Sequence, residues 1–189
     1  MTRNNAGIWL AALVALLAAP VPGPGRADGP AAEPAGADKT AELKMPDSLR
    51  KRHESFHAEF AQATKEDGKV GDAARAIVKQ GDAHFAKAKD VFPPLGLLPA
   101  LAEGKVAPGM AEAVKTAEKL RASLPQIRRD YRELVGGLKR LEEAAKGEGK
   151  AHYVRFAERL TLHIQEEEEV LYPAVLLVGD HVQRGLAGR

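Results

Sequence analysis

The chain has 189 residues, with 28 Lys and Arg against 26 Asp and Glu. This length suits one domain with additional terminal segments. The chain contains no cysteine, which excludes disulfide bonds, thiolate metal ligands and cysteine nucleophiles. The nearly balanced charge argues against nucleic acid as a partner.

The first 27 residues have the features of a secretion signal. Arg3 precedes an apolar stretch, residues 6–19, that is too short to span a bilayer comfortably, and small residues precede Asp28. We therefore expect a secreted or periplasmic protein without membrane contact after signal cleavage. The alternative is an uncleaved membrane anchor. Cleavage removes Arg3 and Arg26 and no acidic residue, so 28 basic residues become 26, against 26 acidic ones.

The rest of the chain divides by composition. Residues 28–44 are rich in Ala, Pro and Gly and have no apolar period, which predicts a flexible linker. Residues 45–182 contain long periodic apolar patterns and no second linker of this kind, so we expect one domain there. Residues 183–189 are expected to form a C-terminal tail.

Two helices are predicted in the first half of the domain. The first begins at Asp47 or Ser48, both good N-cap residues, and ends near Gly68. The second spans about residues 72–92 and ends before two prolines. Apolar residues three and four apart form a seam on each helix that should face a core. These seams are Leu49, His53, Phe56, Phe60, Ala63 in the first and Ala74, Ile77, Gly81, His84, Ala88, Val91 in the second.

Two more helices follow a connector at residues 95–107, which has room for one short helix. They span about residues 108–145 and 150–178, and we expect Pro125 and Pro173 to bend them. Four long amphipathic helices with mostly short connections predict an all-α fold, an antiparallel (up-down-up-down) four-helix bundle. The seams are Met110, Val114, Ala117, Leu120, Leu124, Ile127, Tyr131, Leu134, Leu138, Leu141 and then Tyr153, Phe156, Leu160, His163, Glu167, Val170, Ala174, Leu177.

Polar side chains lie within these apolar seams. Burying them without partners would cost several kcal/mol. Imidazole and carboxylate groups on facing helices of a bundle suit iron, manganese or zinc. We therefore predict a metal site with the candidate ligands His53, His84, Tyr131, His163 and Glu167. The alternative for each of them is a hydrogen-bonded residue of the core.

The other polar residues near the seams receive simpler interpretations. His57 lies one turn after His53 but off the seam, so it is expected to flank the site. His152 is expected at the surface, and His181 follows a glycine at which the last helix should end. The remaining acidic residues around Glu167 are expected to form the solvated side of the helix: Glu166, Glu168 and Glu169.

Three segments of the chain match a known pattern. They are Arg52-His53-Glu54, then His84-Phe85 with Val91-Phe92-Pro93-Pro94-Leu95, and, most closely, His163-xxx-Glu167-Glu168-x-Val170-Leu171-Tyr172-Pro173. Over about residues 45–182 the chain resembles the hemerythrin-like family, which has the HHE cation-binding domain. The resemblance implies a four-helix bundle that holds a non-haem di-iron centre. It also implies a protein that binds, carries or senses dioxygen, stores or senses iron, or reacts with peroxide or nitric oxide.

Two positions depart from the family's pattern. The pattern has a carboxylate four residues after His84, where this chain has Ala88. It has a histidine in the third helix, where this chain has Tyr131. An expected bridging carboxylate and an expected imidazole are therefore missing. The space beside Ala88 is expected to hold a water molecule or a small cavity.

These departures leave several forms of the site open. If Glu167 bridges two metal ions, one ion would have His53 and His84, and the other would have His163 and Tyr131. Alternatively, only one ion binds, held on the side of His53 and His84, with or without His163. In the third case the site is lost and the bundle survives as a scaffold.

The sequence favours an exported hemerythrin-like protein that binds non-haem iron, in a di-iron or mononuclear site. Through this iron it would bind or sense dioxygen or a related small oxidant. The alternative is a metal-free bundle that acts as a partner-binding module. An enzyme, such as one that reduces peroxide, ranks lowest because no motif specifies a substrate pocket or a second redox group. We expect neither haem nor a nucleotide, and the sequence does not identify a protein partner.

Overall fold

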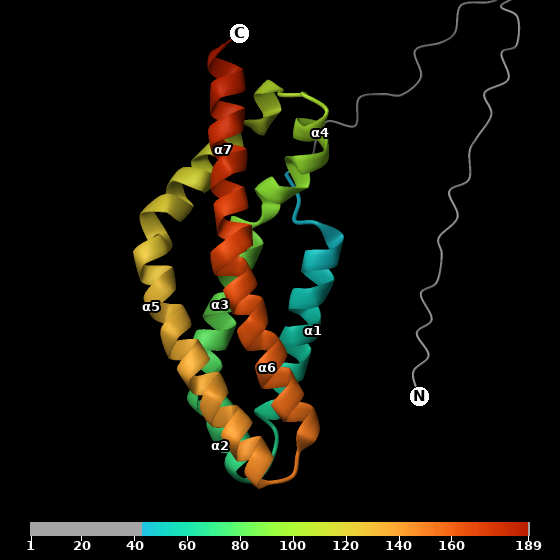
Figure 1. The fold of residues 1–189 in the computed structure, drawn as a ribbon, viewed down its shortest axis with the longest axis vertical. Coiled ribbons are helices and arrows are strands. Elements are labelled where there is room, and N and C mark those ends of the chain that lie inside the picture. Colours follow the sequence, from blue (N-terminus) through green and yellow to red (C-terminus); the bar gives the residue numbers. More distant parts are fainter. Residues whose placement is uncertain (1–42, 189) are drawn as a thin grey trace, which may run out of the picture. The chain divides into compact units, whose positions relative to one another are not determined.

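The structure is a computed structural model that describes residues 43–188. The predicted signal peptide and residues 28–42 of the predicted linker lie outside the described residues. Helices make up nearly all of the described chain, and no strand occurs within it, so the predicted all-α fold is confirmed there. The helices, labelled in Figure 1, are α1 (Asp47–Ala63), α2 (Gly68–Ala76), α3 (Val78–Val91), α4 (Leu98–Ala102), α5 (Ala111–Gly147), α6 (Ala151–Glu166) and α7 (Tyr172–Ala187).

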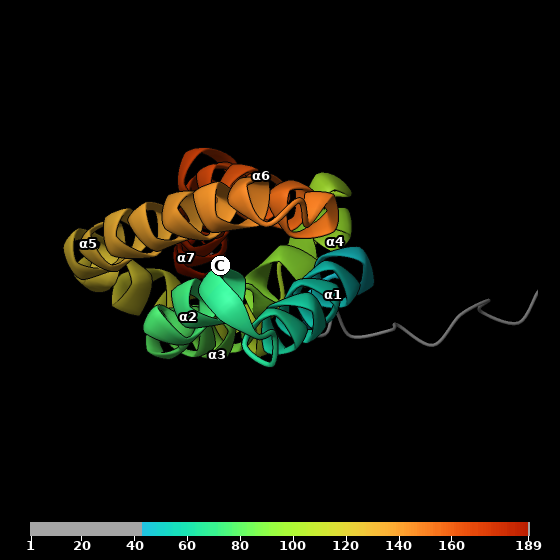
Figure 2. The same ribbon diagram turned by 90° about the horizontal axis from the view of Figure 1, so that it is seen from below.

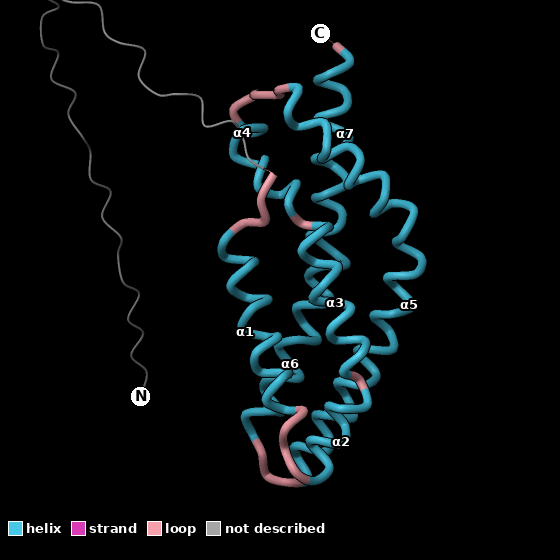
Figure 3. The backbone as a smooth tube through the Cα atoms, turned by 180° about the vertical axis from the view of Figure 1, so that it is seen from behind, coloured by secondary structure: helices cyan, strands magenta, loops and turns pink. Residues whose placement is uncertain are grey.

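The helices enclose one main apolar core. Figure 2 shows α1, α2 and α3 on one side and α5 and α6 on the other. The long helix α5 packs against α2, α3, α6 and α7, while α1 packs against α3 and α6. The connections between helices are short, as Figure 3 shows. None of the helices described is both long and apolar enough to cross a membrane.

The first predicted helix is confirmed on its buried face but is shorter than expected. All five residues of its predicted seam are buried in α1. The helix ends at Ala63 rather than near Gly68, and Gly68 instead has a φ of +79°, a backbone conformation that glycine adopts readily. The Arg75 guanidinium donates to the carbonyl oxygens of Thr64 and Glu66, at 2.8 and 3.1 Å. These bonds hold the turn between α1 and α2.

The second predicted helix is two helices. The chain departs from helical geometry at Ile77, where φ is −118° and ψ is 10°, so α2 and α3 are separate. The Ile77 side chain packs onto the backbone of α5 at Gly137. The predicted connector contains α4, and two short 3₁₀ helices flank it, η1 (Pro93–Leu97) and η2 (Pro108–Met110). The third predicted helix is α5, which contains Pro125 and is visibly bent in Figure 1.

The fourth predicted helix contains a wide turn that the apolar pattern did not predict. A π-helical segment, η3 (Glu167–Leu171), joins α6 to α7. Two predicted seam residues beyond Glu167 are exposed, Val170 by 56% and Leu177 by 66%. The buried residues instead lie one or two positions later, at Tyr172, Val175, Val178 and Val182.

Pro173 gives the physical reason for this turn. Its nitrogen has no hydrogen to donate to the carbonyl of Glu169, so the regular helical hydrogen bonds are interrupted there. The π-helical turn directly precedes it. The expected helix end near residue 178 is also wrong, because α7 continues to Ala187.

Two adjacent glycines in α5 provide a test of this packing. A Cβ at Gly137 would lie 2.0 Å from Cγ2 of Ile77, whereas a Cβ at Gly136 would have only the Arg140 side chain nearby, at 3.9 Å. We expect Gly137→Ala to lower the free energy of unfolding by about 1–3 kcal/mol. The matched control Gly136→Ala should leave it unchanged or raise it by about 0.5–1 kcal/mol. Urea unfolding monitored by circular dichroism measures both, and equal effects would contradict the close packing.

Candidate metal centre

Four buried polar side chains meet in the core. His53 comes from α1, His84 from α3, His163 from α6, and Glu167 is the first residue of η3. Their exposed fractions are 7%, 4%, 3% and 0%. One nitrogen or oxygen atom from each lies within 4.8 Å of the others, an arrangement that could hold a metal ion. The structure thus brings four of the five predicted ligands together.

Three of these atoms form a tight triangle. His53 Nε2 lies 2.8 Å from Glu167 Oε1 and 2.8 Å from His163 Nε2. The third side, from His163 Nε2 to Glu167 Oε1, is 3.2 Å. Metal–nitrogen and metal–oxygen bonds of about 2.0–2.2 Å would place ligands at right angles about 3 Å apart. The triangle therefore has the dimensions of three adjacent ligands of one ion.

Hydrogen bonds alone do not satisfy this triangle. A neutral imidazole has one ring proton, and an ionised carboxylate only accepts. If both Nε2 atoms carry protons, two donors face each other at 2.8 Å. If only one does, the lone pair of the other nitrogen faces the carboxylate oxygen. A cation between the three atoms removes this conflict, because all three can then offer it a lone pair.

The second oxygen of Glu167 has a different environment. Tyr131 donates its hydroxyl proton to Oε2, and the Tyr172 hydroxyl contacts that of Tyr131. His84 Nδ1 lies 3.2 Å from the Tyr131 hydroxyl and 3.6 Å from Oε2. A consistent set of donors exists here, since Tyr172 and His84 can both donate to the oxygen of Tyr131. Hydrogen bonds within the protein therefore satisfy the Oε2 side.

The structure groups the predicted ligands differently from the sequence-based expectation. In the two-ion form considered from the sequence, His53 would share an ion with His84, and His163 would share the other with Tyr131. Instead His53 and His163 meet at Oε1 of Glu167, while His84 and Tyr131 lie together near Oε2. An apolar seam indicates which face of a helix points inward. It does not determine how far one helix is shifted along the axis of the next, and this shift decides which side chains meet. The contacts found here therefore differ from that two-ion grouping.

Tyr172 is a site residue that sequence reasoning missed. An unbroken α-helical pattern after Glu167 turns positions 170 and 174 inward, and so leaves Tyr172 off the seam. The π-helical turn instead makes Tyr172, five residues after Glu167, the next buried position. Pro173 was the available signal, because a proline inside a helical pattern disturbs the turn that precedes it.

Burial and hydrogen bonding set the charges of the cluster. Burial opposes ionisation of Glu167, but its close polar contacts with the imidazoles of His163 and His53 outweigh burial and lower the pKa of Glu167 to about 2. Burial also lowers the pKa of His84 to about 4. Burial and the nearby carboxylate raise the pKa of Tyr131. The cluster thus combines an ionised carboxylate with a neutral imidazole at His84, the protonation states in which these groups bind a metal.

Glu166 supports the orientation of His163 from outside. Its Oε2 lies 3.5 Å from His163 Nδ1 and accepts from the Arg52 guanidinium at 2.5 Å. Carboxylates that hold the second ring nitrogen of a histidine are common around metal sites. Glu166 was expected only on the solvated side of the helix; it is partly exposed but also reaches the site. By contrast, His53 Nδ1 and His84 Nε2 are buried without a hydrogen-bond partner among residues 43–188.

The remaining histidines lie outside the cluster. His57 is exposed, with Nε2 3.7 Å from Asp82 Oδ1, and His152 and His181 are exposed as well. Ala88 is buried one turn after His84. Its methyl group offers no metal-binding atom at the position where the resemblance implied a carboxylate.

Comparison with known proteins identifies the family. A family model for the hemerythrin HHE cation-binding domain matches residues 44–175. This is most of the chain, so the protein belongs to the hemerythrin-like HHE family. Neither the curated proteins nor the solved structures gave a match.

The donor set fits the metal that this family implies. Hemerythrin-like domains bind metal, typically iron. Three imidazoles and one carboxylate are suitable ligands for iron, and they are buried together here. The hydrogen-bonding conflict at Glu167 Oε1 is the local observation that supports a cation at this point.

His84 should link stability to pH in the metal-free protein. Because burial lowers its pKa from 6.5 to about 4, the unfolded chain binds a proton between these pH values that the folded chain does not. The free energy of unfolding should therefore decrease as the pH falls through this window, by about 3 kcal/mol in total from this residue. Urea unfolding of chelator-treated protein at several pH values measures the slope.

The variant His84→Gln removes the titrating group. The free energy of unfolding of this variant should therefore change less between pH 6.5 and pH 4. The exposed residue His152 provides the control, since His152→Gln should keep the original slope. An unchanged slope in the His84 variant would show that another group is responsible.

Proposed function

We propose that this protein is an exported hemerythrin-like protein that binds one non-haem iron ion and, through it, binds or senses dioxygen or a related small oxidant. The single observation that supports the metal best is the triangle of His53, His163 and Glu167, whose three atoms lie 2.8–3.2 Å apart in the core. These residues would hold the ion, with His84 as the nearest further ligand. Bound iron would supply an open coordination position and an electron for a small oxidant.

The environment of Glu167 favours one ion over two. A cation at Oε1 would resolve the conflict between the two imidazoles, whereas Oε2 already accepts a hydrogen bond from Tyr131. A second ion on the Oε2 side would have to displace the hydroxyl proton from a phenol whose pKa is raised by burial. It would also find no ligand at Ala88. The mononuclear form therefore agrees best with the geometry.

The protein's own residues give this site three properties. Tyr131 holds the Oε2 oxygen, which orients Oε1 toward the two imidazoles. Phe92 stacks on His53 with ring centroids 5.8 Å apart, and Phe56 lies 5.2 Å from the ring of His163. These aromatic walls exclude bulk water and restrict entry to small molecules.

Two further features belong to the proposal. We place the described helices in the up-down-up-down four-helix arrangement predicted for this chain. We also propose that residues 1–27 are removed on export to the periplasm or the exterior. The mass of the protein recovered from the exported fraction tests the second point, because a mature chain should begin at Asp28.

Metal analysis tests the proposed iron site. Protein reconstituted anaerobically with ferrous iron should contain about one iron per chain, and its visible spectrum should change on exposure to dioxygen. His163→Ala and Glu167→Gln should each lower the bound iron at least tenfold, because each removes a corner of the triangle. The exposed control His152→Ala should bind iron normally.

The other outcomes separate the alternatives. Two irons per chain would contradict the mononuclear form. A protein that stays metal-free would overturn the proposed function and favour the partner-binding module. In that case, Ala88→Glu combined with Tyr131→His should restore metal uptake.

Glu166 provides a second test of the same site. Removing its charge with Glu166→Gln weakens the acceptor for His163 Nδ1 and the ion pair with Arg52. We expect iron affinity to fall about 10–100-fold. Glu169→Gln is the matched control, since Glu169 is exposed on η3 and does not belong to the buried group of ligands. Competition with a chromophoric chelator measures both affinities, and equal values would exclude a supporting role for Glu166.

A further inference from the structure

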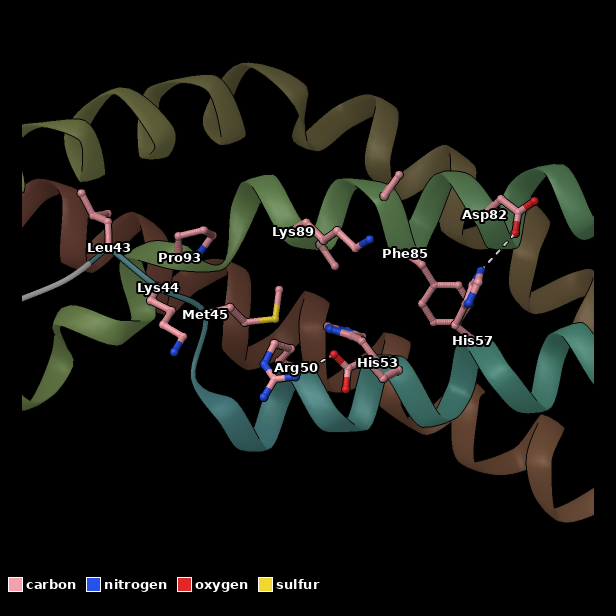
Figure 4. A pocket seen from close by; sticks show the side chains of 13 residues that line it. Leu43, Lys44, Met45, Arg50, His53, His57, Asp82, Phe85, Lys89 and Pro93 are labelled. Atoms are coloured by element: carbon pink, nitrogen blue, oxygen red, sulfur yellow. Dashed lines mark hydrogen bonds and ion pairs between the residues drawn. The ribbon is translucent and has the colours of Figure 1, made fainter.

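A pocket lies between α1 and α3 and is bordered at one point by the metal centre. Its volume is about 660 Å³, which is in the range for small-molecule binding sites. His53 is the one residue of the His53, His84, His163 and Glu167 cluster that lines it. Figure 4 shows the lining side chains of the two helices facing each other across the pocket.

Much of the pocket wall is apolar. The start of the described chain contributes Met45, α3 contributes Phe85 and Ala88, and Pro93 follows the end of α3. Because position 88 is an alanine, no long side chain extends from this part of the wall. Since the wall is mostly apolar, a ligand that fills the pocket would need an apolar body.

The polar groups at the pocket favour an anion. Glu54 is neutralised by Arg50 at 2.7 Å, and Asp82 lies 3.7 Å from His57, as the dashed lines of Figure 4 mark. Lys89 also lines the pocket, and its ammonium forms no ion pair with any residue in 43–188. A ligand with a negative charge would give Lys89 a partner.

His53 supplies a second unmatched group. Its Nε2 belongs to the triangle at Glu167, and its ring borders the pocket. Its Nδ1 is buried and has no hydrogen-bond partner among the described residues. When Nε2 offers its lone pair to a metal, Nδ1 carries the ring proton and needs an acceptor.

We propose that this pocket is a binding site for a small organic carboxylate with an apolar body. The carboxylate accepts hydrogen bonds from Lys89 Nζ and His53 Nδ1, and the apolar body lies against Met45, Phe85 and Pro93. Binding at this site does not require iron, because in the metal-free protein the carboxylate itself favours the His53 tautomer that carries its proton on Nδ1. With iron bound, the carboxylate would also hold His53 in the tautomer that leaves Nε2 free for the metal, a consequence that rests on the proposed function.

Three matched probes test the charge preference. They are 4-phenylbutanoate, 4-phenylbutan-1-ol and 4-phenylbutylamine, which share one apolar body. Isothermal titration calorimetry on the mature protein should give a dissociation constant at least tenfold lower for the carboxylate than for the alcohol, and the weakest binding for the amine. Equal binding of acid and alcohol, or no binding of the acid, would overturn the proposal.

Variants test the position of the site. Lys89→Glu should weaken carboxylate binding at least tenfold, while Lys51→Glu, at an exposed position of α1 outside the pocket, should not. Ala86→Phe should obstruct the pocket, and Ala83→Phe, exposed on the same helix but not lining it, is the control. Because Lys89, Ala86 and both control residues are exposed, these changes should leave folding intact. Carboxylate binding unaffected by both Lys89→Glu and Ala86→Phe would place the ligand elsewhere.

The contact with His53 has its own readout. In a long-range ¹H–¹⁵N spectrum, the Nδ1 signal of His53 should shift when 4-phenylbutanoate is added and should stay in place with the alcohol. This measurement can be made on metal-free protein, so it separates the pocket from the iron site. If the protein binds iron but shows no such shift, only the proposed carboxylate site is contradicted. If the shift occurs but no iron binds, only the proposed function is contradicted.

Discussion

The carboxylate of Glu167 is the group on which the rest of the structure depends. It is fully buried, and isolated burial of a charged carboxylate would cost several kcal/mol. Its partners come from separate helices: His53 on α1, His84 on α3, Tyr131 on α5 and His163 on α6. Each of these helices must therefore be positioned along its own axis so that its polar side chain reaches Glu167. The apolar seams drive association, but this one charge determines how the helices are aligned.

The π-helical turn makes the two oxygens of Glu167 unequal. It brings Tyr172 into the core beside Tyr131, and the two hydroxyls together satisfy Oε2. Without the extra residue in this turn, an exposed position such as Val170 would face inward, where it could offer no hydrogen bond. Wide turns of this kind often occur at functional sites. Here the turn leaves Oε1 as the oxygen that accepts no hydrogen bond from a tyrosine and faces two imidazoles.

Periodicity in the sequence was sufficient for part of this architecture. It predicted every buried residue of α1 and placed His53, His84, His163 and Glu167 in the core, because a regular helix repeats its inward face. It did not predict the break between α2 and α3 at Ile77, although the buried positions continue across that break, and it failed to predict the buried positions after Glu167. Periodicity also could not show which ligand side chains meet, because the axial shift between two helices depends on how they pack against each other. Glu166 shows the same limit: its contact with His163 depends on Arg52, which lies 114 positions away along the chain.

The two departures from the family's pattern compensate each other. Relative to the family's pattern, Ala88 removes one negative charge from the site. Tyr131 has a phenol in place of an imidazole, and this phenol donates a hydrogen bond to Glu167 Oε2. A second metal ion needs additional anionic ligands to offset its charge in a buried site. An alanine at position 88 and a phenol at position 131 would therefore both disfavour a second ion, in keeping with the one-ion site proposed above. Ala88 also lines the pocket beside His53, where its short side chain leaves space. The residue that offers no ligand to a second ion therefore also contributes to the neighbouring cavity.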